Sequence, residues 1–291
     1  MIILVCDPFH PSLPEKLSRF GEVTDDLGRL SEADVALVRS KTKCTAEWMD
    51  KAPNLKLIVR GGVGLDNIDL EAAKARGIEV RNTPEASSVA VAELAMTLLL
   101  ALANPIIQGH LGMKEGKWLK KELKRKELYG KTLGLLGIGR IGNETARRAA
   151  AFGMEIVAYD PYVKSHDLAR LAGLEEMVSG SDFISLHVPL TDQTRGMVNR
   201  DLISRMKDGV GIVNTCRGGI IDEEAVAEAL ESGKIGGYAT DVWLSDPPDP
   251  SSPILKAPNT VLLPHIGAST AENLLRIGEI IERILEEFSG K

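Results

Sequence analysis

The sequence predicts an α/β protein with two doubly wound parallel sheets, and three observations lead to this prediction. Short apolar runs alternate with helix-like segments along the 291 residues, which is typical of parallel strands covered by helices on both faces. A glycine-rich turn at 137–142 joins one apolar run to a helix, and Asp160 ends the next run. A chain of this length can bury a large core and is expected to form two domains.

The first unit is predicted from four strand-like runs and the helix-like segments between them. The strands are expected at residues 2–6, 35–38, 57–59 and 78–80, and the helices at 14–20, 45–51 and 70–76. A loop with Gly61, Gly62 and Gly64 directly follows the third run, so it lies at the carboxyl end of the sheet, where open α/β sheets bind ligands. Its N–H groups can face an anion. We expect a smaller, flavodoxin-like domain here.

The second, larger unit is predicted to follow a buried helix at 87–103 and a polar connection that ends near Gly130. Its strands are expected at 133–136, before Asp160, and at 183–188, 210–215, 238–242 and 261–263, with helices up to residue 152 and at 200–206 and 223–231. A final helix at 271–288 has no strand left to follow and can return to the first unit. The expected domains are therefore 1–92 with 269–291, and 93–268.

The glycine turn has the spacing of a dinucleotide-binding fingerprint. Gly137 and Gly139 allow a tight turn near a pyrophosphate, Gly142 allows helix and strand to pack closely, and the helix N-terminus favours an anion. Asp160 lies where a carboxylate can accept from ribose hydroxyls. Glycines in this pattern also serve ordinary turns, but the strand, helix, strand and acid together predict a Rossmann domain.

The residues after Asp160 favour NAD over NADP. Pro161 and Tyr162 follow it directly, and neither can hold a 2′-phosphate as arginine or lysine does. Lys164 is the nearby basic residue that weakens this preference.

Composition narrows the class of protein. The net charge of −6 argues against binding to nucleic acid or to acidic membranes, and the basic run at 117–126 is expected on a solvated helix face. Three scattered cysteines, Cys6, Cys44 and Cys216, fit a reducing cytoplasm and exclude a CxxC metal site. The longest apolar stretch, 89–103, is too short to span a bilayer, and we expect no signal peptide.

Polar groups of catalytic type follow three later strands of the second unit. Arg217 follows one strand, Asp241 and Asp246 follow the next, and His265 follows the last. A carboxylate beside a histidine raises its basicity and fixes its tautomer, and arginine can bind a carboxylate in bidentate fashion. With a nicotinamide, this set suffices for hydride transfer to or from a 2-oxo or 2-hydroxy acid.

Each of these residues also has a structural interpretation. Arg217 can be a surface residue of a glycine-rich loop, His265 can cap the following helix, and Asp246 can start a turn before two prolines. Their joint occurrence beside a dinucleotide fingerprint favours the catalytic interpretation.

The chain resembles the D-isomer-specific 2-hydroxyacid dehydrogenases over nearly its whole length. The resemblance is carried by VRS (38–40), RGGVGLDNIDLEAA (60–73), NTP (82–84), MKEGKW (113–118), the glycine fingerprint, HVPLTDQTRGMVN (187–199), NTCRGGIIDE (214–223) and PHIGAST (264–270). Several such motifs in the same order are highly specific.

The resemblance implies a catalytic set of Arg217, Asp246 and His265. His265 would act as general acid and base on the C2 oxygen, Arg217 would bind the substrate carboxylate and carbonyl, and Asp246 would support His265. The family usually has glutamate at the position of Asp246. Because aspartate is one methylene shorter, we expect its contact with His265 to lengthen, to use water, or to need a backbone shift.

The resemblance also implies the residues that bind NAD and substrate. The NAD set is Val63, Gly137, Gly139, Arg140, Ile141, Gly142, Asp160, Val188, Cys216, Arg217, Asp241, His265, Gly267 and Ala268. The substrate set is Arg39, Arg60, Gly62, Val63 and Gly64, the two arginines being otherwise exposed residues at strand ends. A thiol nucleophile at Cys216 is disfavoured because no motif places a second base for it. No metal is implied.

The helix at 87–103 resembles the family's dimer element, so a homodimer is expected. The alternative is that this helix is a core helix within one chain.

Within the family, the likeness is greatest to members that oxidise D-3-phosphoglycerate to 3-phosphohydroxypyruvate in the first step of serine synthesis. That reaction is therefore the expected one. A glyoxylate or hydroxypyruvate reductase shares the catalytic set and differs in lacking a phosphate site. A protein that senses NAD(H) and recruits partners, as corepressors of this fold do, is a third possibility.

Overall fold

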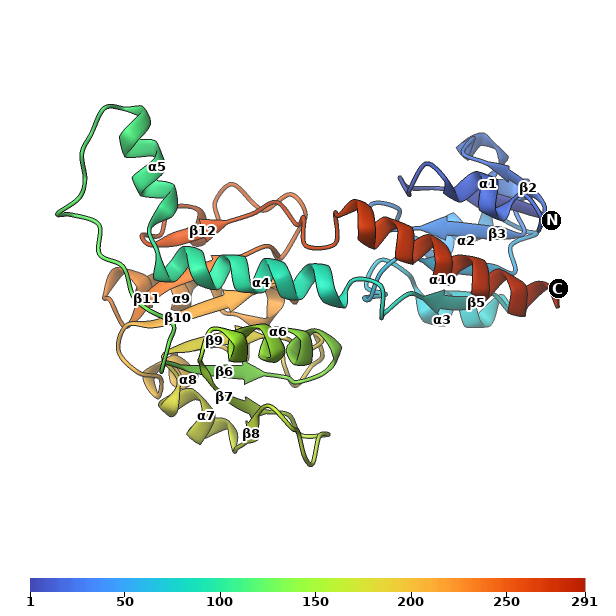
Figure 1. The fold of residues 1–291 in the computed structure, drawn as a ribbon. Coiled ribbons are helices and arrows are strands. Elements are labelled where there is room, and N and C mark those ends of the chain that lie inside the picture. The colour runs from blue at the N-terminus through green and yellow to red at the C-terminus, as the bar shows by residue number, and fades with distance from the viewer. Residues whose placement is uncertain (291) are drawn as a thin grey trace. The chain divides into compact units, whose positions relative to one another are not determined.

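The computed structural model describes residues 1–290, and the chain folds into two compact units (Figure 1). Unit 1 comprises Met1–Ala90 and Ala268–Lys291, and unit 2 comprises Val91–Gly267. From the sequence we expected the units to divide after residues 92 and 268.

Unit 1 contains a five-stranded parallel sheet in the order β2-β1-β3-β4-β5, which is the flavodoxin-like order. Its strands are β1 (Ile2–Val5), β2 (Glu22–Thr24), β3 (Val35–Val38), β4 (Leu57–Arg60) and β5 (Glu79–Asn82). The four predicted strands are present. β2 was not predicted, because three residues with no buried side chain form no apolar run.

Alternate residues of the unit 1 strands face two separate apolar clusters. On one face, Ile3, Val35 and Leu57 pack with α1 (Leu13–Leu17) and α10 (Ala271–Ser289). On the other, Ala36 and Ile58 pack with α2 (Ala46–Asp50) and α3 (Leu70–Ala75). The final helix therefore covers the first sheet, although it lies at the far end of the sequence.

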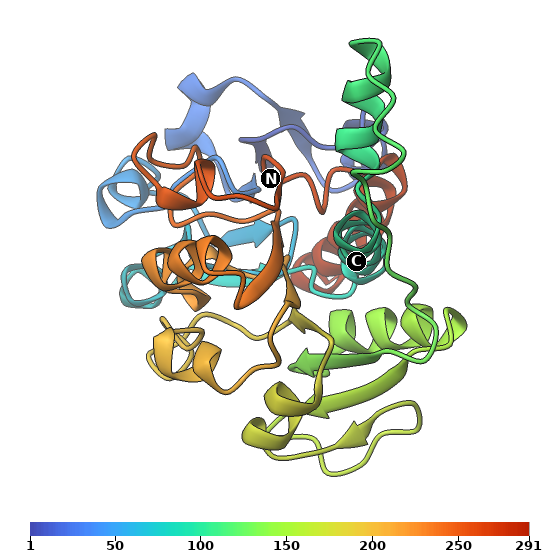
Figure 2. The ribbon, with the colours of Figure 1, turned by 90° about the vertical axis from the view of Figure 1, so that its left-hand side faces the viewer.

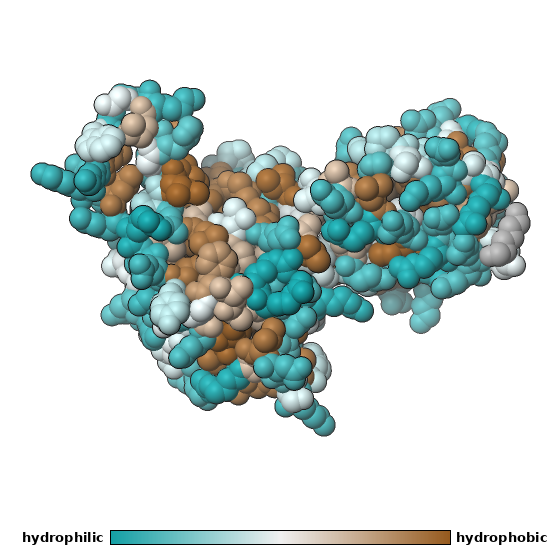
Figure 3. All heavy atoms as spheres, viewed as in Figure 1, coloured by the Kyte–Doolittle hydropathy of each residue, from teal (hydrophilic) through white to brown (hydrophobic). Residues whose placement is uncertain are grey.

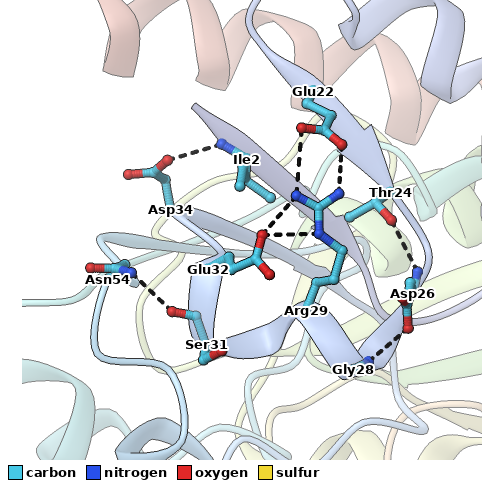
Figure 4. Close-up of polar contacts among 10 residues, drawn as sticks. All are labelled: Ile2, Glu22, Thr24, Asp26, Gly28, Arg29, Ser31, Glu32, Asp34 and Asn54. Carbon is cyan, nitrogen blue, oxygen red and sulfur yellow. Dashed lines mark hydrogen bonds and ion pairs between the residues drawn. The ribbon is translucent and has the colours of Figure 1, made fainter.

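Polar contacts hold the connection between β2 and β3, which includes the short helix η1 (Leu27–Glu32). Arg29 donates to Glu22 at 2.5 Å and to Glu32 at 3.0 Å, so one guanidinium joins β2 to the end of η1 (Figure 4). Asp34 accepts from the N–H of Ile2 at 2.9 Å. Arg29 is partly exposed and both of its acidic partners are more than half exposed, so these contacts order the connection more than they stabilise the fold.

Unit 2 contains a seven-stranded parallel sheet in the order β12-β11-β10-β9-β6-β7-β8. Its strands are β6 (Thr132–Leu136), β7 (Glu155–Tyr159), β8 (Arg170–Leu171), β9 (Phe183–Leu186), β10 (Val210–Asn214), β11 (Ile235–Thr240) and β12 (Thr260–Leu262). The chain order reverses between β6 and β9, which is the switch point where open α/β sheets bind ligands. Both units thus have the predicted doubly wound parallel sheets.

Helices cover both faces of the unit 2 sheet (Figure 2). One face packs with α4 (Ser88–Ala103) and α6 (Arg140–Ala151), and the other with α7 (Leu174–Gly180), α8 (Arg200–Ser204) and α9 (Glu223–Glu231). Two further short helices are η2 (Gly218–Ile220) and η3 (Pro253–Leu255). Neither β8 nor α7 was predicted, because both are short and carry little apolar periodicity.

The expected polar connection before Gly130 contains a helix, α5 (Ile106–Lys114). The basic run at 117–126 follows α5 as turns and irregular chain, so its expected place on a helix face was wrong. Among the described residues, no single helix has the length and apolarity needed to cross a membrane. The pair α4 and α5 has them only when taken together, and the two are bent by 66°.

Leu285 on α10 gives a test of how unit 1 is held together. It is fully buried in the cluster beneath α10, whereas Leu275 on the same helix is 36% exposed. We expect Leu285→Ala to lower the free energy of unfolding by about 2–5 kcal/mol, because it leaves a cavity in a packed core. Leu275→Ala should lower it by less than about 1 kcal/mol. Urea unfolding followed by circular dichroism measures both, and equal losses would contradict the packing of α10.

Candidate functional site

The predicted residues of unit 2 gather at one edge of its sheet. Because all its strands are parallel, the segments that follow them leave from the same edge. These segments carry the glycine turn after β6, Asp160 after β7, Val188 after β9, Arg217 after β10, Asp241 after β11 and His265 after β12. The topology therefore places the predicted cofactor and catalytic groups along a single edge.

The glycine turn has the backbone geometry of a phosphate-binding loop. Gly137 has φ +91°, and a Cβ there would lie 2.8 Å from the carbonyl oxygen of His187. A Cβ on Gly142 would lie 2.5 Å from the carbonyl oxygen of Gly137. Open space surrounds the Cβ position of Gly139, the N-cap of α6, so a ligand can approach the backbone there. Arg140 and Ile141 form the first turn of this helix, whose N–H groups favour an anion.

Asp160 was predicted to bind the ribose beside the glycine turn, and the backbone of that turn donates a hydrogen bond to it. One carboxylate oxygen accepts from the N–H of Ile138 at 3.0 Å, and the other accepts from the N–H of Tyr162 at 2.9 Å. Each oxygen keeps a second lone pair that can accept from a ribose hydroxyl. The loop, the helix N-terminus and this carboxylate fit a dinucleotide.

The backbone of His187 packs against Gly137 of the glycine turn, a role that the sequence analysis did not assign. Its imidazole Nε2 lies 2.9 Å from the Ser185 hydroxyl, and burial lowers the pKa of His187 to about 4, so the ring is neutral. The Val188 side chain, from the predicted NAD set, also approaches Gly137. Only the position of the HVPL motif directly after a strand could have suggested this support.

Cys216 is a buried thiol. Its Sγ lies 3.2 Å from Asn214 Oδ1, and burial raises the pKa of Cys216 to about 11. A neutral thiol is a poor nucleophile. The structure therefore agrees with a packing or cofactor role in preference to covalent catalysis.

The Arg217 loop is shaped by the buried amide of Asn214. Asn214 accepts from the N–H of Cys216 at 3.1 Å and donates to the carbonyl oxygen of Arg217 at 3.0 Å. The Arg217 guanidinium is half-buried and donates to the carbonyl oxygen of Cys216 at 2.6 Å. Next to it, a Cβ on Gly218 would overlap the carbonyl of Trp243, so the Arg217 and Trp243 loops are in close contact.

Asp246 and His265 form a direct pair. Asp246 Oδ2 lies 2.5 Å from His265 Nδ1, and both side chains are partly exposed. Of the three outcomes expected for the shorter aspartate, a longer contact and a bridging water do not apply to this direct contact, which leaves a shift of the loop backbone. Since Nδ1 is engaged by Asp246, Nε2 is the ring nitrogen available to a substrate.

The backbone of His265 is in the left-handed region, with φ +57°. Such backbone is strained in non-glycine residues and is often found at functional sites. Asp241, which is 2% exposed, accepts from the N–H of Ile266 at 2.8 Å and from that of Gly267 at 2.6 Å. Burial raises the pKa of Asp241, while these two bonds favour its carboxylate. The resemblance implied that Asp241 binds NAD, and in the structure it holds the loop of His265. Ala268, which completes that loop, accepts from Asn273 at 2.6 Å.

The predicted substrate residues lie in unit 1 at the carboxyl ends of β3 and β4. Gly62 has φ +146°, and a Cβ there would overlap the Arg60 guanidinium, which donates to the carbonyl oxygen of Gly61 at 3.4 Å. Val63 is 39% exposed, and Gly64 completes this loop. The glycine loop and Arg60 are therefore packed against each other.

Arg39 is held by its backbone and leaves much of its guanidinium without protein acceptors. Its N–H donates to Asp7 at 2.5 Å, its Nη1 donates to the carbonyl oxygen of Pro8 at 3.4 Å, and its buried Nε has no partner among the described residues. Burial lowers the pKa of Arg39, although a guanidinium stays charged at neutral pH. Such a group can accept an anionic ligand.

Within residues 1–290, no group of three or more histidine, cysteine, aspartate or glutamate side chains is arranged to hold a metal ion.

Comparison with known proteins relates this arrangement to one family. Residues 96–267 match the family described as D-isomer specific 2-hydroxyacid dehydrogenase, NAD binding domain. The chain is 53% identical to a hydroxypyruvate reductase of Thermotoga maritima, over 89% of this chain and 86% of that protein. It is 46% identical to a D-3-phosphoglycerate dehydrogenase of Methanocaldococcus jannaschii, over 99% of this chain but 58% of that protein. An NAD-dependent formate dehydrogenase from Staphylococcus aureus in complex with NAD has a similar structure, with a TM-score of 0.87, 34% identity, and coverage of 99% of this chain and 95% of that one.

Proposed function

The chain belongs to the D-isomer specific 2-hydroxyacid dehydrogenase family and is an NAD-dependent enzyme of that class, and on this premise we propose that it interconverts hydroxypyruvate and D-glycerate. The observation that carries the choice of substrate is the 53% identity to a hydroxypyruvate reductase of which the chain spans 86%. The D-3-phosphoglycerate dehydrogenase has a lower identity to the chain, 46%, and the chain spans only 58% of it.

In the proposed mechanism, His265 carries the proton and Arg217 holds the substrate. NAD(H), when bound, exchanges a hydride with C2 of the acid. During reduction, the Nε2 of protonated His265 donates a proton to the C2 oxygen, and Asp246 at Nδ1 fixes the tautomer and balances the charge. The Arg217 guanidinium binds the carboxylate and polarises the adjacent carbonyl.

Substitution of the two central residues tests this mechanism. We expect His265→Gln to lower kcat at least about a hundredfold, because general acid–base catalysis is lost. Arg217→Ala should lower kcat/KM by a similar factor or more, because it removes both binding and polarisation. Steady-state NADH oxidation with hydroxypyruvate measures both effects. Arg170→Ala, which removes an exposed cation that pairs with Glu176, is the control and should match the wild type. Full activity in His265→Gln or Arg217→Ala would disprove the mechanism.

A second candidate is the oxidation of D-3-phosphoglycerate, the reaction expected from the sequence. It is favoured by Arg39 beside the glycine loop of unit 1, whose guanidinium donates to the carbonyl oxygen of Pro8 and whose buried Nε has no partner among the described residues. Arginine is well suited to bind phosphate. In this case the chain would catalyse the first step of serine synthesis.

A substrate panel separates the two candidates. We compare kcat/KM for hydroxypyruvate, 3-phosphohydroxypyruvate, glyoxylate and pyruvate in the wild type, Arg39→Ala and Arg60→Ala. We expect hydroxypyruvate to be preferred, because the chain is most similar to a reductase of that acid among the relatives compared. A preference of about tenfold or more for the phosphorylated acid that disappears in Arg39→Ala would replace this proposal with the second candidate.

The panel also needs a control, and one further outcome would change the proposal. Lys41→Ala removes an exposed cation from the same loop as Arg39 and is the control for a general loss of positive charge. NADH binding without turnover of any acid would instead favour the NAD(H)-sensing protein.

We also propose that the chain forms a homodimer. The expected dimer helix, α4, is largely buried within its own chain, whereas several exposed apolar side chains lie on α5 and just after it. Ile106 is 60% exposed, Leu111 52%, Met113 57% and Trp118 73%. Apolar residues are visible among hydrophilic ones at the surface over α5 (Figure 3). A cluster of this kind is typical of a protein interface.

Light scattering after size exclusion tests the dimer. We expect a mass of twice the 31.4 kDa of one chain for the wild type. Leu111→Asp should give a monomer at the same concentration, because it places a charge in the apolar contact. Leu168→Asp, at a side chain 44% exposed elsewhere in unit 2, should remain dimeric. A monomeric wild type would contradict the proposal.

A further inference from the structure

The contact between Asp246 and His265 requires two loops to come close together. Asp246 is short, with a single methylene between its backbone and its carboxylate, and it lies on an exposed loop after β11. Its Oδ2 nevertheless lies 2.5 Å from His265 Nδ1. Glutamate would reach about 1.5 Å further, the length of one carbon–carbon bond. The backbone of the Asp246 loop must therefore be held near the end of β12.

Trp243 connects the Asp246 loop to the end of β12. Its indole Nε1 donates to the carbonyl oxygen of Leu263 at 2.9 Å. Trp243 precedes Asp246 by three residues, and Leu263 precedes His265 by two. The last ladder contact between the two strands is the N–H of Leu263 to the carbonyl of Thr240, also at 2.9 Å. The indole bond thus joins the two segments just beyond the ladder, on the side toward the Asp246–His265 pair.

The backbone of Trp243 is also held from the opposite side. A Cβ on Gly218 would overlap the Trp243 carbonyl and approach the N–H of Leu244 at 2.5 Å. The peptide after Trp243 therefore lies directly on the backbone of Gly218, next to Arg217. The half-buried indole packs against the apolar cluster on one face of the unit 2 sheet. These contacts leave the Asp246 loop little room to move away from His265.

We propose that Trp243 is a positioning residue for the Asp246–His265 pair. Its indole N–H keeps the segment 243–246 close enough to β12 for the short aspartate to reach Nδ1. The inference rests on the proposed role of this pair in proton transfer. The alternative is that Trp243 only fills space, in which case its ring matters and its N–H does not.

Trp243→Phe separates these two roles, because it keeps an aromatic ring and removes the donor. We expect kcat for hydroxypyruvate to fall about fivefold or more, which corresponds to the loss of one hydrogen bond. KM should change less than about twofold, since the substrate carboxylate is bound elsewhere. Trp48→Phe, at a half-buried tryptophan of unit 1, is the matched control and should leave kcat unchanged.

Asp246→Glu provides the decisive arm of the experiment. The longer side chain can reach His265 even when the loop lies further from β12. We therefore expect Trp243→Phe to lower kcat about fivefold in the wild-type background and less than about twofold in the Asp246→Glu background. We expect Trp243→Phe to lower the melting temperature, and we expect the double variant to melt at the same lowered temperature. The reason is that Asp246→Glu restores the contact of the carboxylate with His265 but not the hydrogen bond of the indole. Equal losses of kcat in both backgrounds, or no loss in Trp243→Phe, would overturn the inference. Full activity of His265→Gln would instead disprove the proposed mechanism itself.

Discussion

The geometry of the candidate site depends on one buried carboxylate, that of Asp241. The left-handed backbone at His265 costs about 1–2 kcal/mol relative to ordinary backbone. Asp241 opposes this cost by accepting from the next two N–H groups, those of Ile266 and Gly267. Hydrogen bonds to a charged acceptor each contribute about 1.5–3 kcal/mol, so the pair is sufficient to hold the strained loop.

Three neighbouring strand ends form a single framework around this carboxylate. The N–H of Asp241 donates to the carbonyl of Asn214 at 3.1 Å, and Asn214 in turn shapes the loop of Arg217. Gly218 then supports the backbone of Trp243. The loops after β10, β11 and β12 are therefore in mutual contact. The His265 loop is held by Asp241 at the end of β11, and the segment that carries Asp246 contacts Gly218 after β10 and Leu263 after β12. These contacts bring residues that are far apart in the sequence to one edge of the sheet.

The sequence predicted those parts of the structure that rest on local pattern. Apolar runs identified most strands, and the glycine spacing with Asp160 identified the dinucleotide loop, because strand burial and turn geometry leave direct signals. β2, β8 and α7 are too short to leave such a signal. The sequence left three outcomes open for Asp246, a longer contact, a bridging water or a backbone shift, because side-chain length is visible in a sequence, whereas the position of a loop is not. That position depends on the contact of Trp243 with Leu263, twenty residues away.

The residues proposed to perform proton transfer and those proposed to select the substrate belong to different units. Arg217, Asp246 and His265 lie in unit 2, where neighbouring loops contact one another, and in the proposed mechanism they act on the carboxylate and carbonyl that every 2-oxo acid has. Arg39 and Arg60 lie beside the glycine loop of unit 1, where the Arg39 guanidinium donates to the Pro8 carbonyl and the Arg60 guanidinium donates to the Gly61 carbonyl. Proteins that share this fold and reaction can thus differ in substrate while their catalytic loops stay the same. On the proposed function, unit 2 supplies the groups for the reaction itself, and the two guanidinium groups of unit 1 are the ones proposed to distinguish one acid from another.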